Sequence, residues 1–208
     1  MKKKINSKSI YDRLGEFLSQ KSAFLFILGI GVVMSLINFN ARISEAHDDS
    51  LYIEAAYRYV HEFPNYFYTS NAPMYSMFLA LLTLIFGTNL IVFKFFSVIF
   101  FVLAAILFYK ALDKKVPELI KYFVFIFVCI NHYIIYYSSQ TFSESFYMLI
   151  QACFFYYFSK YNFGENPISD DYKKDYKKWL TLGLWMMLLT LAKNILLFGI
   201  AAIILFYV

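Results

Sequence analysis

The stretch that decides the fold is His47-Asp48-Asp49-Ser50-Leu51-Tyr52, which lies between the first apolar segment and an amphipathic pattern. Two adjacent carboxylates beside an apolar segment are costly to desolvate, so they are candidates for a functional site. The structural alternative is that the acidic residues cap the N-terminus of a helix and suit the positive end of its dipole. Capping accounts well for one aspartate and weakly for the second, and both interpretations stay open at this point.

The residues that follow, 49–62, have the period of an amphipathic helix. Such a helix is expected to lie on a membrane surface, and Pro64 ends it. The pattern places Tyr52, Ile53, Ala56, Tyr57 and Val60 on the apolar face and Glu54, Arg58, His61 and Glu62 on the polar face.

The composition is that of an integral membrane protein built from helices. Hydrophobic residues make up 61% of the 208, and aromatic residues make up 22%, whereas soluble proteins have about 45–50% apolar residues. The mean hydropathy is +0.56. The net charge of +5 comes from lysines between the apolar runs, which is typical of topology signals and contact with anionic lipid headgroups. No basic face of the kind that binds nucleic acid is present, so we expect no nucleic-acid partner.

One apolar run, 72–86, is too short to cross a bilayer, because 15 residues of helix reach about 22 Å and the hydrocarbon core is about 30 Å thick. If this run crossed, two lysine-rich loops would lie outside the cell. Since lysines favour the cytoplasmic side, we expect Pro73–Phe86 to form a re-entrant or interfacial helix within a large first outer loop. The lysines concerned are Lys110, Lys114, Lys115, Lys121, Lys160, Lys173, Lys174, Lys177 and Lys178.

The expected architecture is a single all-α transmembrane domain, a helical bundle of about six spans. The chain ends at Val208 without a polar flank, so we also expect it to be truncated from a longer parent. The segments are a cytoplasmic leader (1–21), span 1 (22–38), an outer loop with two interfacial helices (39–89), spans 2–4 (90–158), a cytoplasmic loop (159–178) and a helical hairpin (179–208) that turns near Lys193.

In this topology the turn over 136–144 lies outside, which places Glu144 on the same side as Asp48 and Asp49. We treat 122–137 as one span leading to that turn. Glu144 shares a helical face with Tyr147 and Gln151, and this polar stripe is expected to face the interior of the bundle.

The order of these features resembles the N-terminal module of the GT-C glycosyltransferases, within the branch that contains protein mannosyltransferases and aminoarabinose transferases. The acidic pair followed by Tyr52 is similar to the family's first-loop motif. Ala72-Pro73-Met74-Tyr75 resembles its Pro-Pro-Leu-Tyr helix with the first proline replaced, and Phe86-Gly87 ends that helix. Glu144 after Tyr136-Tyr137-Ser138 matches the second acidic position, and Lys193 matches the basic residue of a later span.

The resemblance implies transfer of a sugar from a polyprenyl-phosphate carrier to an acceptor hydroxyl on a glycan, lipid or protein. Such a transfer needs a base to take the hydroxyl proton, and we assign this role to Asp48. The leaving phosphate needs a positive partner. Lys193 is one candidate, and a Mg²⁺ or Mn²⁺ ion bound by Asp49 and Glu144 is the other, because such ions prefer oxygen ligands.

We therefore expect a multi-pass protein of a bacterial plasma membrane with its site on the outer face. Two other classes stay open. An inactive or truncated remnant or a structural membrane subunit fits the short length, and a transporter fits less well because no internal repeat is present.

Overall fold

The computed structural model describes residues 21–43, 47–67, 72–161 and 172–194. These residues form eight helices and no strand, which confirms the all-α expectation. The expected cytoplasmic leader lies outside the described residues, apart from Lys21 at its end. The helices are α2 (Lys21–Ile37), α3 (His47–Glu62), α4 (Met74–Phe86), α5 (Leu90–Ala111), α6 (Glu118–Ile130), α7 (His132–Ser138), α8 (Ser143–Lys160) and α9 (Tyr172–Ala192).

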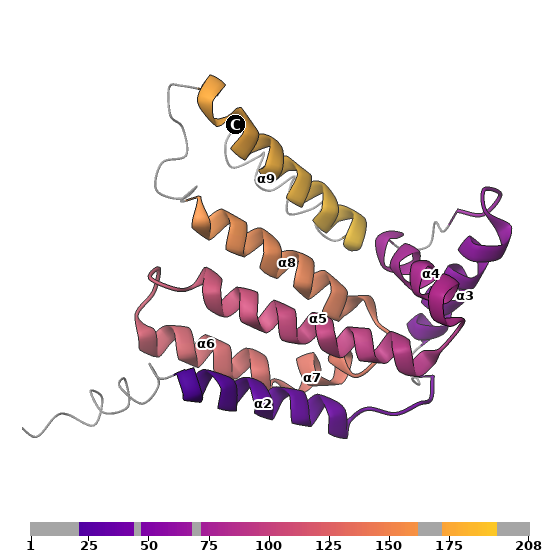
Figure 1. Ribbon diagram of the computed structural model, residues 1–208, viewed down its shortest axis with the longest axis horizontal. Coiled ribbons are helices and arrows are strands. Elements are labelled where there is room, and N and C mark those ends of the chain that lie inside the picture. The colour runs from indigo at the N-terminus through magenta and orange to yellow at the C-terminus, as the bar shows by residue number, and fades with distance from the viewer. Residues whose placement is uncertain (1–20, 44–46, 68–71, 162–171, 195–208) are drawn as a thin grey trace, which may run out of the picture.

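The long helices lie side by side, and the two helices of the first loop gather at one end of them (Figure 1). Helix α5 lies in the middle of the bundle and packs mainly against α8. Helix α2 packs on α6, and α9 packs on the other side of α8. Helices α3 and α4 pack on each other at the end where α5 and α8 begin and α9 ends.

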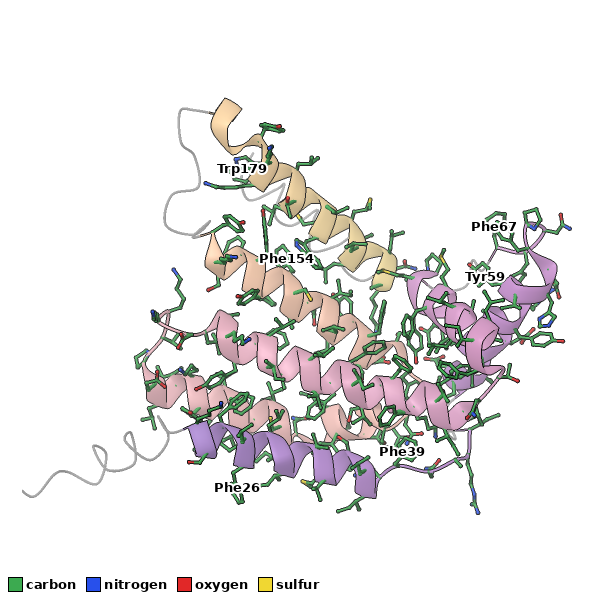
Figure 2. All side chains as sticks on the ribbon, in the orientation of Figure 1. Phe26, Phe39, Tyr59, Phe67, Phe154 and Trp179 are labelled. Carbon is green, nitrogen blue, oxygen red and sulfur yellow. The ribbon has the colours of Figure 1, made fainter. Side chains whose placement is uncertain are left out.

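Helix α5 is, among the described residues, the one helix that is long and apolar enough to cross a membrane by itself. Its 22 residues reach about 33 Å, the thickness of a hydrocarbon core. Helices α2 and α4 are apolar but shorter. Phe26 of α2 points away from the bundle and is 69% exposed, as expected for a side chain that faces lipid (Figure 2). Length and composition thus support one or two spans, and the expected count of about six is not confirmed.

The span expected over 122–137 consists of two helices, which together are long and apolar enough for one broken span. Helix α6 ends at Ile130, and α7 starts at His132 at an angle of 53° to it. The Asn131 side chain causes the break, because its Oδ1 accepts hydrogen bonds from the backbone N–H groups of Tyr133 and Ile134. A short polar side chain in this role satisfies the first N–H groups of a new helix, so the old one need not continue.

Helix α3 has a buried face that is rotated from the predicted one. Asp49, Tyr52 and Ala56 are buried. Tyr57, predicted on the same face, is 48% exposed and stacks on His61 with ring centroids 4.0 Å apart. Asp49 lies three residues before Tyr52 and seven before Ala56, and residues at these spacings share one side of a helix. The rotation therefore places Asp49 in the interior.

Helix α4 joins the first loop to the bundle. The Phe78 ring lies 5.1 Å from that of Phe100 and 5.7 Å from that of Phe146, and so connects α4 with α5 and α8. The opposite side of α4 is apolar and exposed, as expected for a helix in contact with lipid. That side carries Met77, Leu81, Leu84, Ile85 and Phe86.

The predicted cytoplasmic loop over 159–178 is shorter than expected, because residues 172–178 already belong to α9. Lysine is a good helix former, so a lysine-rich stretch can extend a helix into water. The helix ends at Ala192, immediately before Lys193, where the hairpin turn was predicted. The second limb of that hairpin lies outside the described residues.

Helices α2 and α6 approach each other closely at Gly31. A Cβ atom added there would lie 2.9 Å from the carbonyl oxygen of Cys129 and 3.0 Å from the Phe101 ring. One turn further along α2, the Ser35 and Ser138 hydroxyls lie 2.8 Å apart. The contact therefore depends on the missing side chain of Gly31.

We predict that Gly31→Ala destabilises the protein by about 1–3 kcal/mol, the usual cost of forcing an extra methyl group into a packed contact. Gly29→Ala is the matched control, because a Cβ atom at Gly29 meets nothing within 4 Å. The melting temperatures of both variants are measured by thermal unfolding in detergent, with the reactivity of the buried Cys129 thiol as the signal of unfolding. Equal melting temperatures for the two would contradict the close approach.

Candidate functional site

The sequence-predicted acidic residues lie at the end of the bundle that α3 and α4 cover. The first turn of α3 carries Asp48 and Asp49, and the first turn of α8 carries Glu144. The Tyr52 hydroxyl lies 3.1 Å from the Ser143 hydroxyl, so the second turn of α3 contacts the start of α8 directly. This contact brings the acidic turn of α3 and Glu144 into one neighbourhood.

Glu144 forms an ion pair with Lys193, the basic residue predicted from the later span. The Lys193 ammonium donates a hydrogen bond to Glu144 Oε1 over 2.7 Å, and each side chain is 35% exposed. The ammonium also lies 6.0 Å from the centre of the Tyr147 ring, one turn along α8. The pair joins the start of α8 to the end of α9 and stays accessible to a ligand from outside.

The two aspartates have different surroundings. Asp48 is exposed, whereas Asp49 is completely buried. Asp49 lies close enough to Tyr75 of α4 and Lys94 of α5 for its charge to act on both. Burial raises the pKa of the Tyr75 phenol above its ordinary value, and the Asp49 charge acts in the same direction. Tyr75 is therefore a neutral hydroxyl beside a buried carboxylate.

Lys94 is a buried site residue that the sequence analysis did not identify. Its ammonium donates hydrogen bonds to Asn40 Oδ1 at 3.0 Å, to the Arg42 carbonyl oxygen at 2.5 Å and to Gln140 Oε1 at 2.7 Å. The side chain is 0% exposed. A signal was present, since Lys94 is a single lysine within the apolar run that forms α5, and ionisable residues in such runs are rarely incidental.

Polar side chains fill the interior at this end, in contrast to the aromatic core further along the bundle. They come mostly from residues 138–145, which include the end of α7, the turn after it and the start of α8. A polar interior of this kind orders a site because each buried hydroxyl or amide must find a partner. The buried residues are Ser97, Ser138, Ser139, Gln140, Thr141, Ser143 and Ser145.

The predicted metal ligands lie near lysines. Glu144 is paired with Lys193, and the charge of Asp49 interacts with that of Lys94. Within the described part of the chain, no three His, Cys, Asp or Glu side chains gather as they would around a metal ion. This donor set gives more support to lysine than to Mg²⁺ or Mn²⁺ as the partner of a phosphate, and the metal site on Asp49 and Glu144 stays a prediction.

The described residues thus form helices only, with one apolar helix of membrane length and a carboxylate–lysine cluster at one end of the bundle. The sequence model of the Alg9-like mannosyltransferase family matches residues 53–208. The chain belongs to this family, which is GT-C-like and consists of membrane proteins, and the expected resemblance is confirmed. No curated protein and no solved structure matches the chain.

The matched region contains Glu144 and Lys193 and begins just after Asp48 and Asp49. The matched region therefore includes both residues of the ion pair between α8 and α9. The acidic turn is tied to the matched region by geometry, through the contact between Tyr52 and Ser143.

We predict that Glu144 and Lys193 are energetically coupled. In a double-mutant cycle of Glu144→Gln and Lys193→Met, the coupling free energy of unfolding should be about 0.5–1 kcal/mol, the range for partly exposed ion pairs. Chemical denaturation in mixed micelles measures it. Glu54→Gln combined with Lys193→Met is the control and should be additive, because Glu54 pairs with Arg58 on the exposed side of α3. If the effects of Glu144→Gln and Lys193→Met on the free energy of unfolding were additive, the ion pair would not be formed.

Proposed function

We propose that this protein transfers a mannose-type sugar from a polyprenyl-phosphate carrier to an acceptor hydroxyl, at the bundle end where α3 meets α8. The observation that carries the proposal is the accessible Glu144–Lys193 pair beside the acidic turn of α3, in a chain of a mannosyltransferase family. Sugar transfer from a lipid phosphate needs a base and a cation within one site. The acceptor is a glycan, a lipid or a protein.

Asp48 acts as the base in this proposal. Its carboxylate is exposed in the first turn of α3 and is accessible to an acceptor, unlike the buried Asp49. Asp48 takes the proton of the acceptor hydroxyl while the hydroxyl oxygen attacks the anomeric carbon of the sugar. The bond from that carbon to the phosphate oxygen breaks, and its electron pair leaves with the lipid phosphate.

Lys193 meets the negative charge of the leaving phosphate. An ammonium that is half-buried and already oriented by Glu144 Oε1 needs little reorganisation when a phosphate oxygen approaches it. Glu144 therefore orients the lysine, and Asp49 orients the turn that carries Asp48. Both carboxylates support the reaction without taking the proton.

We further propose that the chain crosses a bacterial plasma membrane several times, with this site on the outer face. At the end of α5 that lies far from α3 (Figure 1), Lys110 is in the last turn of the helix, and Lys114 and Lys115 follow the helix. Lysines favour the cytoplasmic side. The acidic turn then lies outside, and α4 rests in the outer leaflet.

We predict that Asp48→Asn lowers sugar transfer by about 10²–10⁴-fold, the usual contribution of a general base. Stability should fall by no more than about 1 kcal/mol, because Asp48 is exposed in the first turn of α3 and the change removes only its charge near the helix N-terminus. The assay follows labelled mannose from dolichyl- or undecaprenyl-phosphate mannose in proteoliposomes. Glu54→Gln is the control, since Glu54 is an exposed carboxylate on the same helix. Transfer at the wild-type rate by folded Asp48→Asn protein would contradict the role of Asp48 as the base.

The topology has its own test. In a chain with Cys129→Ala and Cys153→Ser, a cysteine at Asn65 should react with a membrane-impermeant thiol reagent added to intact cells, because this exposed residue follows α3. A cysteine at Asp113, which is exposed at the opposite end, should react only after the membrane is opened. Labelling of both positions in intact cells would mean that the two ends lie on the same side.

A further inference from the structure

Lys94 connects three segments of the chain through its ammonium. Lys94 belongs to the second turn of α5, Asn40 and Arg42 belong to the connection between α2 and α3, and Gln140 belongs to the turn between α7 and α8. All three acceptors lie within 3.0 Å of the lysine Nζ. An ammonium has three N–H donors, so these three bonds use its full capacity.

The acceptors lie in the segments that precede the two functional turns. Asn40 and Arg42 lead into the first turn of α3, where Asp48 and Asp49 are found. Gln140 lies three residues before Ser143 and four before Glu144. The buried Lys94 side chain therefore binds the segments that precede the acidic turn and the carboxylate–lysine pair.

The charge balance makes this arrangement sensitive to Lys94. Asp49 is completely buried, and the Lys94 charge acts on it. A buried carboxylate is tolerated when an opposite charge and hydrogen bonds accompany it, and it is strongly unfavourable when the partner is removed. Loss of the ammonium is therefore expected to move Asp49 toward water and to displace the turn that contains Asp48.

We propose that Lys94 is the positioning residue of this site, which fixes the acidic turn of α3 relative to Glu144 and Lys193. Its three N–H donors are all used within the chain, so this role does not require contact with substrate. It acts through these three hydrogen bonds, which link the segments that precede the two turns. Its effect on catalysis rests on the proposed function, whereas its effect on the position of the α3 turn does not.

The chain supplies a matched control in Lys121, a second buried lysine at the opposite end of the bundle. Lys121 is 3% exposed and donates hydrogen bonds to Asp113 at 3.0 Å and to Glu118 at 2.8 Å. Lys94→Met and Lys121→Met each remove one buried ammonium and keep an apolar side chain of similar length. Lys94→Arg retains the charge and several donors.

The first measurement is hydrogen–deuterium exchange of the 208-residue chain in nanodiscs. Lys94→Met should speed exchange of peptides from the first half of α3 by about 10-fold or more, because the turn loses its attachment. Lys121→Met should leave these peptides unchanged, and Lys94→Arg should restore much of their protection. Unchanged α3 exchange in Lys94→Met, or equal acceleration in Lys121→Met, would overturn the proposal.

The second measurement is the kinetics of mannose transfer. A misplaced base lowers kcat, so Lys94→Met should lower kcat by about 10–100-fold, since small displacements cost that much. KM for the lipid-linked sugar should change by less than about 3-fold, because the three donors of Lys94 bond to groups of the chain itself. A rise in KM at constant kcat would overturn the positioning role. Absence of transfer in the wild-type chain would instead contradict the proposed function, and the exchange data would still decide the position of the turn.

Discussion

A buried ammonium must be surrounded by acceptors, and this requirement organises both ends of the bundle. At one end Lys94 joins the entry to α3, the start of α5 and the turn before α8. At the other end Lys121 joins the loop after α5 to the first turn of α6, and its ammonium lies 4.5 Å from the Tyr109 ring. Hydrogen bonds are directional, so these two lysines set the helix register that apolar packing alone leaves free.

Between the two ends the contacts are aromatic and largely non-directional. Phe78, Phe100 and Phe146 bring α4, α5 and α8 together. Such rings provide packing area, and small changes in their relative angle cost little. The polar end therefore determines where the acidic turn lies, while the aromatic core holds the helices that support it. Because the polar end and the aromatic core have these separate roles, the protein can combine an apolar exterior with an ordered polar site.

Helix positions were predictable from the sequence because they depend on local patterns. Periodicity and turn residues predict the apolar run that ends at Phe86-Gly87 and the helix that begins at the acidic pair. They also predict that Glu144 lies near the start of a helix. The break at Asn131 was visible as a polar residue in an apolar run, but capping and burial of an asparagine look alike in sequence. The roles of Lys94 and of the Glu144–Lys193 pair depend on which helices pack together, and no local pattern encodes that packing.

The partial exposure of the Glu144–Lys193 pair links the site to the medium around it. Ions in solution screen exposed charges over about 8 Å at physiological ionic strength, whereas buried charges are screened much less. The contact between α8 and α9 should therefore loosen as salt rises, while the hydrogen bonds of Lys94, whose side chain is buried, should weaken less. The ionic strength of the medium should then act on one side of the site more than on the other, so that the distance between the acidic turn and the Lys193 ammonium is expected to vary with it.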